Sequence, residues 1–421
     1  MQEDFLHYIW QYQKLKSNKL ETIDGERIQV ISVGQRNVNS GPDFFNSRLV
    51  IGDQEWAGNV EIHIKTSDWY IHNHEIDENY DNVILHVVWE DDVVVFDAYD
   101  NPVKTLVLKN NVDEKIIENY KKLLSNKLWI NCESDIHTVN SVLLMSLKDS
   151  FLVARLERKS KIIQNDLNKT QNNWEEVLFK QLAKSFGLTA NTHFFEQLVN
   201  SISYSVFKKE ITSRLSLEAL LFGQANMLDD DLNDSYYEQL KNEYLFLKRK
   251  YNLMPVVGKV QFFRMRPANF PTIRLSQFAT LYSLNKNMFS RLIENESVQE
   301  IKQVFKVKAS SYWDTHYVFG KISNKKNLLL SEAFVERLII NVFLPLKYLY
   351  YKTLGKTNFD VVFDLYKSIQ PETNGVIAKF KQLNIKVDHA GDSQALLELK
   401  KYYCDNNKCL NCKIGNKLLY L

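Results

Sequence analysis

The spacing of apolar residues changes near residue 112, and this change constrains the fold more than any other feature of the sequence. Before it, apolar and polar residues alternate in short runs bounded by turn residues, which is typical of β-strands. After it, apolar residues recur at helical spacing over long segments. Gly and Pro number only 13 and 7 in 421 residues, which favours long helices over an all-β architecture. We therefore expect an α+β protein, with a mixed β-sheet module at 1–135 and a large all-α region at 136–421.

The first part predicts one short helix followed by strands. The expected elements are a helix at 3–16, strands at 27–33, 44–51, 55–65 and 82–90, and a hairpin formed by 93–98 and 103–108. The hairpin is expected because the turn residues Asp100, Asn101 and Pro102 separate its two runs. The run 82–90 is apolar enough to be a central strand that is buried on both faces.

The sequence favours a cytoplasmic protein with no membrane partner. Its first residues, MQEDFLHYIWQYQ, contain early acids and no apolar run, so they do not predict a secretory signal. The most apolar later stretch, 338–351, is interrupted by Pro345 and Lys347. It is also shorter than the roughly 20 apolar residues of a membrane span, so we expect a buried helix that ends near the proline. The net charge of +2 excludes a strongly basic nucleic-acid coat but permits a local basic groove.

One strand carries an unusual row of ionisable residues. Glu61, His63 and Lys65 share a face, because side chains alternate along a strand. Such groups are costly on an otherwise apolar strand unless they pair or bind something. Asp43 begins the preceding strand and comes near Glu61 if the two strands pair. Two carboxylates on neighbouring strands suit Mg²⁺ or Mn²⁺, and His63 or Lys65 would then orient the water that attacks a phosphodiester. The alternative is a salt-bridged face of a half-exposed sheet.

Four of the nine histidines lie within 24 positions: His63, His72, His74 and His86. A lone histidine such as His86, inside an apolar strand, is more often a hydrogen-bonded core residue than a ligand. Four together favour a transition-metal site, because imidazole is a common ligand of Zn, Fe and Ni. His72 and His74 are spaced to supply two ligands to one metal. A His-centred metal hydrolase is therefore an alternative to a Mg²⁺-dependent or Mn²⁺-dependent enzyme.

The chain has four cysteines, of which Cys404, Cys409 and Cys412 form a Cys-x4-Cys-x2-Cys motif and Cys132 stands alone. Four thiolates satisfy a tetrahedral Zn²⁺ site or a [4Fe–4S] cluster. If all four converge, the C-terminal motif packs back on the N-terminal module. The alternative is that they are free or partly buried thiols.

Three arginines flank the loop 267–271: Arg264, Arg266 and Arg274. A helix that starts beside arginines can hold a phosphate, so these residues are candidates for binding a phosphorylated cofactor or substrate. The alternative is a rigid structural loop in which the arginines bond to backbone carbonyls.

Pro42-Asp43 followed by Glu61-x-His63 resembles the PD-(D/E)xK, restriction-endonuclease-like superfamily, with His63 at the lysine position. The resemblance implies a metal-dependent nuclease core and nucleic acid as a partner. The one-plus-three arrangement of cysteines resembles members of that superfamily that carry an iron–sulphur cluster. Here, however, the single Cys132 follows the acidic motif instead of preceding it.

Several long strings are similar to one uncharacterised bacterial family, a domain of unknown function common in Bacteroidota. They include GPDFFNSRL (41–49), WAGNVEIHIKTSDWY (56–70) and RPANFPTIRLSQ (266–277). This resemblance implies one architecture for the whole chain and brings no activity with it. The leading hypothesis is therefore a metal-dependent nuclease or a nuclease-derived nucleic-acid-processing protein. The alternative is a non-catalytic binding or scaffold protein with a degenerate nuclease-like fold.

Overall fold

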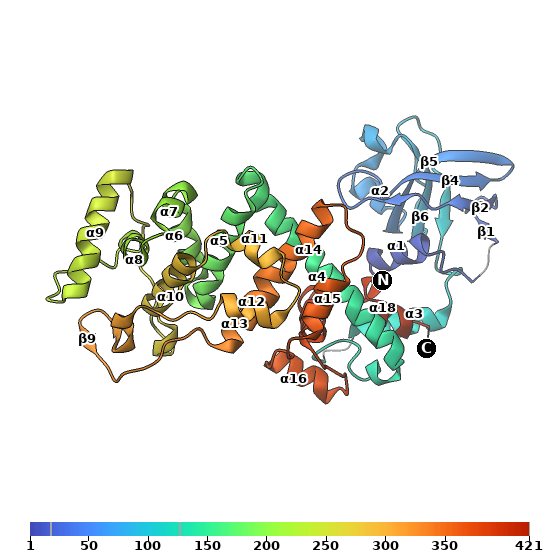
Figure 1. Ribbon diagram of the computed structural model, residues 1–421. Coiled ribbons are helices and arrows are strands. Elements are labelled where there is room, and N and C mark those ends of the chain that lie inside the picture. Colours follow the sequence, from blue (N-terminus) through green and yellow to red (C-terminus); the bar gives the residue numbers. More distant parts are fainter. Residues whose placement is uncertain (17–18, 126–127, 421) are drawn as a thin grey trace. The chain divides into compact units, whose positions relative to one another are not determined.

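Residues from both ends of the chain fold together into one unit, and the middle of the chain forms a second (Figure 1). The computed structural model describes residues 1–16, 19–125 and 128–420. The first unit comprises Met1–Leu147 and Leu399–Leu421, and the second comprises Lys148–Glu398. The first unit thus extends past residue 135 and includes the end of the chain, so the second unit is an insertion within it.

A mixed sheet is the centre of the first unit. Its strands are β1 (Leu20–Glu21), β2 (Arg27–Ser32), β3 (Gln35–Arg36), β4 (Phe44–Ile51), β5 (Gln54–Lys65), β6 (Val83–Glu90) and β7 (Thr105–Val107). The strand order is β1-β2-β4-β5-β6-β7, and β3 pairs with β4. Pairing is antiparallel from β1 to β5 and parallel from β5 to β7. The mixed sheet followed by helices confirms the expected α+β class.

The predicted hairpin of 93–98 and 103–108 forms only next to its turn. An isolated antiparallel bridge joins Phe96 to Pro102, and the backbone N–H of Val103 donates to the Val95 carbonyl, whereas β7 pairs in parallel with β6. Pro102 has no backbone N–H with which to extend an antiparallel ladder. The carboxylate of Asp97 also accepts the backbone N–H groups of two residues in the intervening loop, which closes a local turn.

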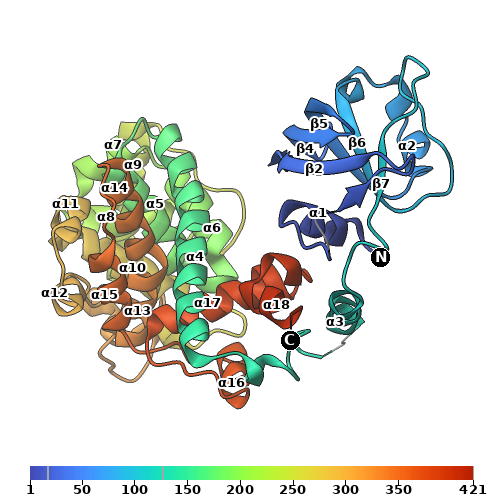
Figure 2. The same ribbon diagram turned by 90° about the vertical axis from the view of Figure 1, so that its right-hand side faces the viewer.

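Helices cover both faces of this sheet (Figure 2). Phe5 of α1 (Glu3–Gln11) contacts the ring of Trp89, whereas Trp69 of α2 (Asp68–Ile71) contacts the ring of His86. Trp89 and His86 are three positions apart on β6, so their side chains point to opposite faces. The crossover from β5 to the parallel strand β6 contains α2, η1 (His74–Ile76) and η2 (Glu78–Tyr80). The remaining helical segments of this unit are α3 (Glu114–Ser125), η3 (Ile136–Thr138), η7 (Leu399–Cys404), η8 (Cys409–Asn411) and α18 (Lys413–Leu418).

The second unit is almost entirely helical and has an aromatic core, in which Phe179, Phe207 and Phe278 contact one another. The long helix α4 (Ser141–Lys169) leads into this unit from the first. The further helices are α5 (Trp174–Phe186), α6 (Leu188–Asn200), α7 (Tyr204–Glu210), α8 (Arg214–Gln224), α9 (Ser235–Tyr251), η4 (Pro267–Asn269), α10 (Pro271–Leu284), α11 (Met288–Ile293), α12 (Val298–Val304), η5 (Ser311–Asp314), α13 (Glu332–Leu338), η6 (Ile339–Phe343), α14 (Leu344–Thr353), α15 (Asp360–Lys367), α16 (Gly375–Gln382) and α17 (Ala390–Glu398). Strands β8 (His316–Val318) and β9 (Lys321–Ile322) form a small hairpin.

The helix expected over the apolar run 338–351 does not end near Pro345, contrary to the prediction. The helix passes from α13 through η6, a π-helical segment, and continues as α14 to Thr353. Pro345 is the second residue of α14, directly after the wider π-helical turn. Such turns re-route backbone hydrogen bonds, which makes the missing N–H of the proline tolerable. Within the described residues, no helix is both long and apolar enough to cross a membrane.

Candidate metal centre

The carboxylates of Asp43 and Glu61 come together where β4 and β5 begin to pair. Phe44 lies opposite Val60 in the antiparallel register, which places the residue before β4 beside Glu61. The backbone N–H of Asp43 donates to Glu61 Oε2 at 3.0 Å, and the backbone N–H of Ile62 donates to Asp43 Oδ2 at 3.0 Å. These reciprocal bonds fix both carboxylates beside each other at the start of β4.

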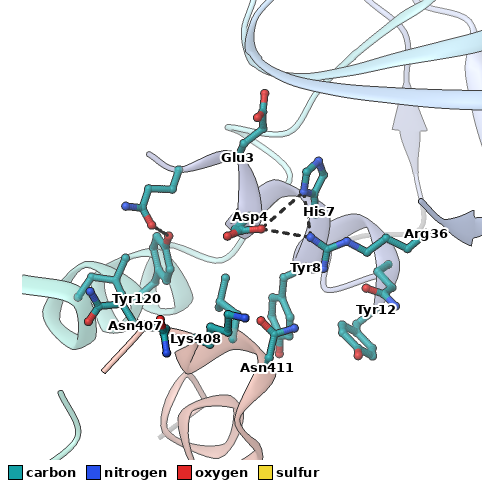
Figure 3. A pocket seen from close by; sticks show the side chains of 15 residues that line it. Glu3, Asp4, His7, Tyr8, Tyr12, Arg36, Tyr120, Asn407, Lys408 and Asn411 are labelled. Atoms are coloured by element: carbon teal, nitrogen blue, oxygen red, sulfur yellow. Dashed lines mark hydrogen bonds and ion pairs between the residues drawn. The ribbon is translucent and has the colours of Figure 1, made fainter. Parts of the chain in front are cut away.

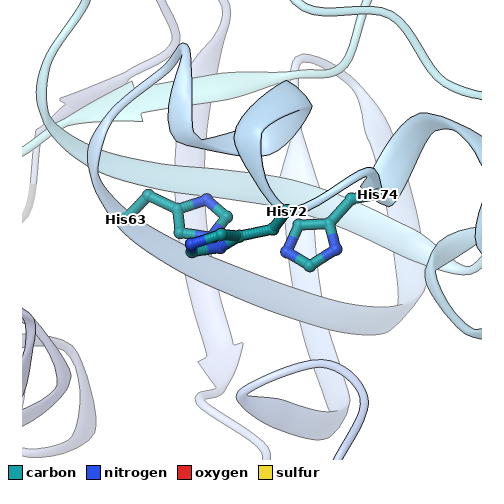
Figure 4. Close-up of side chains that lie close together, drawn as sticks. All are labelled: His63, His72 and His74. Atoms are coloured by element: carbon teal, nitrogen blue, oxygen red, sulfur yellow. The ribbon is translucent and has the colours of Figure 1, made fainter.

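Three histidine side chains converge beside these carboxylates (Figure 4). His63 follows Glu61 on the same face of β5, while His72 ends α2 and His74 begins η1. Asn73 between them has a left-handed backbone, with φ of 60°, which reverses the chain. One donor atom from each histidine lies within 4.8 Å of the other two. Among the described residues, no other trio of His, Cys, Asp or Glu side chains meets this distance.

The Glu61 carboxylate faces the histidine rings. Its Oε1 atom lies 3.4 Å from His63 Nε2 and 3.4 Å from His74 Nε2. His63 Nε2 is also 3.0 Å from His72 Nδ1. Glu61, His63 and His74 are buried, whereas His72 is exposed and places one side of the group at the surface.

Burial controls the charge of this group. It lowers the pKa of His63 to about 2, assisted by the neighbouring His86 and His74, and it also lowers the pKa of His74. Burial raises the pKa of Glu61, and the negative charge of Asp43 raises it further. The imidazoles of His63 and His74 are therefore neutral, which is the form that binds metals. Burial outweighs the opposing charge of His7 and the hydrogen bond from the backbone of Asp43, both of which lower the pKa of Glu61.

A fourth histidine supports His63 from behind. His86 Nε2 lies 2.9 Å from His63 Nδ1, and the ring of His86 is fully buried. Burial lowers the pKa of His86 to about 3, so this ring is neutral as well. When His63 Nε2 acts as an acceptor towards the group, its Nδ1 carries the proton and donates it to His86 Nε2. Metal-ligating histidines commonly have such a partner behind them.

A divalent cation fits the site, as the hydrogen bonding of His74 indicates. Both ring nitrogens of His74 are buried and have no hydrogen-bond partner in the part of the chain that the structure describes. Buried polar atoms without partners are rare in folded proteins because they cost free energy. Tyr80 stacks on the ring at a centroid distance of 3.7 Å and holds its orientation. Unpaired imidazole nitrogens beside a buried carboxylate form a donor set for a transition metal.

Helix α1 contributes two residues that the sequence analysis missed. His7 Nε2 lies 3.0 Å from Asp43 Oδ2. Burial raises the pKa of Glu3, and the charges of His7, Asp43 and His72 also act on this carboxyl. Glu3 and His7 are four positions apart and so share one face of the helix. The available signal was an acid and a histidine at helical spacing on an amphipathic segment.

Lys65 points away from this group, and the three arginines belong to the second unit. Lys65 is exposed, and its Nζ atom is 3.9 Å from Asp92 Oδ2. Arg274, in the second unit, is buried, donates to Asn269 Oδ1 at 2.6 Å and to Gln277 Oε1, and lies over the Phe334 ring. Burial lowers its pKa to about 10. Arg264 and Arg266 are exposed. These contacts favour the structural role for Arg274 that was the alternative to a phosphate site.

The four cysteines line one small apolar cavity of about 20 Å³ in the first unit. Its cysteines are Cys132, Cys404, Cys409 and Cys412. Burial raises the pKa of Cys132 to about 12 and that of Cys412 to about 11. No three of the four sulfur atoms all lie within 4.8 Å of one another, although each described cysteine faces the same cavity. The expected cysteine cluster is therefore not closed at coordination distance.

The model of the family described as "Protein of unknown function (DUF2851)" matches residues 3–375, so the chain belongs to this family. This match confirms the resemblance to a family of unknown function. Neither the comparison with curated proteins nor the comparison with solved structures gave a match. The resemblance to the PD-(D/E)xK superfamily therefore stays a prediction.

Proposed function

We propose that this member of the DUF2851 family is a metal-dependent phosphodiesterase that acts on nucleic acid. The observation that carries the proposal is the convergence of His63, His72 and His74 beside the paired carboxylates of Asp43 and Glu61. A divalent ion bound there would neutralise charge on a phosphodiester and make water easier to ionise. The arrangement of two acids on adjacent strands with His63 two positions after Glu61 agrees with the PD-(D/E)xK resemblance.

The protein side chains have distinct roles in this proposal. Glu61, His63, His72 and His74 would hold the ion, because one nitrogen of each histidine lies within 4.8 Å of the other two and Glu61 Oε1 faces two of the rings. Asp43 would be a further ligand or would orient water, since it is less buried than Glu61 and lies beside it at the start of β4. The exposed His72 would complete the ligand set on the side of the ion that faces solvent. Lys65 has no part in this scheme, because its ammonium lies near Asp92.

The donor set favours Mn²⁺ over Mg²⁺, the two ions expected from the carboxylates alone. Mg²⁺ prefers oxygen ligands and retains several waters. Three imidazoles within 4.8 Å of one another suit Mn²⁺, Fe²⁺ or Zn²⁺ better. A His-centred transition-metal site and the acidic pair would thus be one centre, which unites two alternatives that the sequence left open.

We propose a structural Zn²⁺ ion for the cysteine cavity. A volume of about 20 Å³ holds roughly one water-sized sphere, which accommodates a single ion but not the [4Fe–4S] cluster that was the alternative. Deprotonation on metal binding would offset the burial that keeps these thiols neutral. Purified protein should therefore contain one Zn²⁺ that is absent from Cys409→Ser/Cys412→Ser protein. Equal zinc content in the two proteins, or iron and sulfide in their place, would contradict this assignment.

The phosphodiesterase proposal is tested with single-stranded and double-stranded DNA and RNA in the presence of Mn²⁺. Glu61→Gln is the key variant, because burial already favours the uncharged carboxyl and the neutral amide should fold in its place. It should lose Mn²⁺ binding and all cleavage. Glu55→Gln is the matched control, since Glu55 is an exposed carboxylate on the same strand. Likewise, His74→Ala should abolish cleavage while the exposed control His193→Ala retains it.

Two outcomes would reject the assignment. Cleavage that is equal in wild-type and Glu61→Gln protein would locate the activity elsewhere or in a contaminant. Metal binding at the histidines without cleavage of any nucleic acid would favour either a hydrolase for another substrate class or a non-catalytic scaffold. Screening the Mn²⁺-loaded protein with generic phosphomonoester and ester substrates would distinguish these two.

A further inference from the structure

A cavity of about 520 Å³ lies beside the candidate metal centre in the first unit (Figure 3). Helix α1 forms one wall, and the segment 406–411 between the C-terminal cysteines forms another. Glu3 and His7 belong both to this cavity and to the surroundings of Asp43. Its volume falls within the range of about 300–1,000 Å³ that is usual for small-ligand sites.

His7 connects the cavity to the metal centre. Arg36 Nη2 lies 3.3 Å from His7 Nδ1 and 3.2 Å from Asp4 Oδ1. A guanidinium group can only donate, so His7 Nδ1 is the acceptor of this contact and His7 Nε2 carries a proton. That atom is 3.0 Å from Asp43 Oδ2. A group held by Arg36 would therefore sit one imidazole ring away from a carboxylate of the metal centre.

The cavity offers cations that suit a phosphate. Arg36 uses one nitrogen for its contacts with Asp4 and His7, which leaves other N–H donors of its guanidinium available. Lys408 projects from the opposite wall and has no ion-pair partner among the residues the structure describes. Figure 3 shows Arg36 on the α1 side of the cavity and Lys408 on the ribbon of the C-terminal segment. Arginine and lysine on two walls would hold a phosphate between them.

Aromatic and amide side chains complete the lining. Tyr8 and Tyr12 lie one helical turn apart with ring centroids 5.2 Å apart, and the ring of Tyr12 is 54% exposed. Asn411 faces them from the other wall (Figure 3). An exposed aromatic ring can stack on a base, and amide groups can pair with the edge of a base. Phosphate-binding cations, a stacking ring and an amide are the three chemistries that a nucleotide requires.

We propose that this cavity is a nucleotide subsite, which binds the nucleotide next to the phosphodiester held at the metal centre. Arg36 and Lys408 hold its phosphate, Tyr12 stacks on its base, and Asn411 bonds to the edge of the base. The role of this subsite in catalysis rests on the proposed phosphodiesterase function. It makes single-stranded ends or loops the substrate class, because a base can enter such a cavity only when it is unpaired.

Nucleotide binding without divalent metal is the test. Calorimetry in EDTA should detect binding of AMP and dAMP to the full-length protein, with inorganic phosphate at least tenfold weaker. Arg36→Gln/Lys408→Gln should lower nucleotide affinity about tenfold or more, and Tyr12→Ala should lower nucleotide affinity about tenfold without affecting phosphate. The matched controls Lys109→Gln and Tyr99→Ala alter exposed residues outside the cavity and should bind as wild type does.

The outcomes separate this subsite from the proposed catalysis. Glu61→Gln protein should still bind AMP in EDTA, because Glu61 does not line the cavity. Nucleotide binding that is lost in the cavity variants supports the subsite even if no nucleic acid is cleaved. Absence of AMP and dAMP binding, equal binding of inorganic phosphate, or affinities unchanged in Arg36→Gln/Lys408→Gln and Tyr12→Ala would each overturn it.

Discussion

His86 never faces the candidate metal, yet its replacement should weaken metal binding. It lies 2.9 Å behind His63 and is the only hydrogen-bond partner that the described residues offer to His63 Nδ1. His86→Leu removes that acceptor. His63 is then free to rotate or to move its proton to the nitrogen that should bind the ion. Loss of such a supporting partner typically lowers metal affinity about 10- to 100-fold, or roughly 1.4–2.8 kcal/mol.

The same substitution should also lower stability without metal. It leaves the His63 N–H buried and unpaired, which costs about 1–3 kcal/mol. Denaturant unfolding in EDTA measures this loss of stability. Calorimetric titration with Mn²⁺ measures the metal affinity of the folded protein. His86→Gln supplies an amide oxygen that accepts from His63, and it should recover most of both losses.

The refuting result is a Mn²⁺ dissociation constant that is the same in wild-type and His86→Leu protein. It would mean that His63 does not bind the ion through Nε2. A loss of affinity that His86→Gln fails to restore would mean instead that packing at β6, and not the hydrogen bond, supports the site.

Three other predictions concern packing, pH and the cysteine segment. Gly223→Ala should destabilise the protein by about 1–3 kcal/mol in thermal or denaturant unfolding, because the added Cβ would lie 2.1 Å from a facing tyrosine ring. The control Gly375→Ala adds its Cβ to open space and should not destabilise the protein. Burial lowers the pKa of Lys347 from 10.5 to about 8, so between these pH values the unfolded chain binds a proton that the folded chain does not. Stability should therefore rise with pH across this window by on the order of 3 kcal/mol relative to Lys347→Met, and parallel pH profiles of the two proteins would contradict this. Cys409→Ser/Cys412→Ser should weaken AMP binding several-fold, because the segment 406–411 lies between Cys404 and Cys412, which line the cysteine cavity. If calorimetry finds the same AMP affinity in zinc-free variant protein as in wild type, the cysteine cavity does not support the nucleotide cavity.

The sequence predicted the strands of the centre well because their signals are local. Alternating residues gave β4 its observed bounds, and the row containing Glu61 and His63 placed both on one face. The approach of Asp43 to Glu61 followed from the simple pairing of neighbouring strands. Predicting these features requires only the two-residue period of a strand and the pairing of two strands through a short turn.

The other contacts of the centre join residues of separate elements, so the repeating pattern of apolar residues does not predict them. His72 and His74 meet His63 only because Asn73 adopts a left-handed backbone and the crossover folds back on the sheet. His7 reaches Asp43 from a helix 36 positions earlier. The predicted hairpin of 93–98 and 103–108 forms only next to its turn for a related reason, because most of the second run, as β7, pairs in parallel with the earlier strand β6.

The insertion of Lys148–Glu398 within the first unit has a consequence for synthesis on the ribosome. The sheet and the histidines emerge before the inserted unit, but the segment 406–411 that walls the cavity emerges after it. At about 5–20 residues per second, roughly 12–50 s pass while the inserted unit is translated. During that interval the nascent chain carries the candidate metal ligands without the cavity proposed to hold a nucleotide. A chain whose translation stops within the inserted unit would therefore lack one wall of the cavity, so nucleotide binding is expected only after the segment 406–411 has been made.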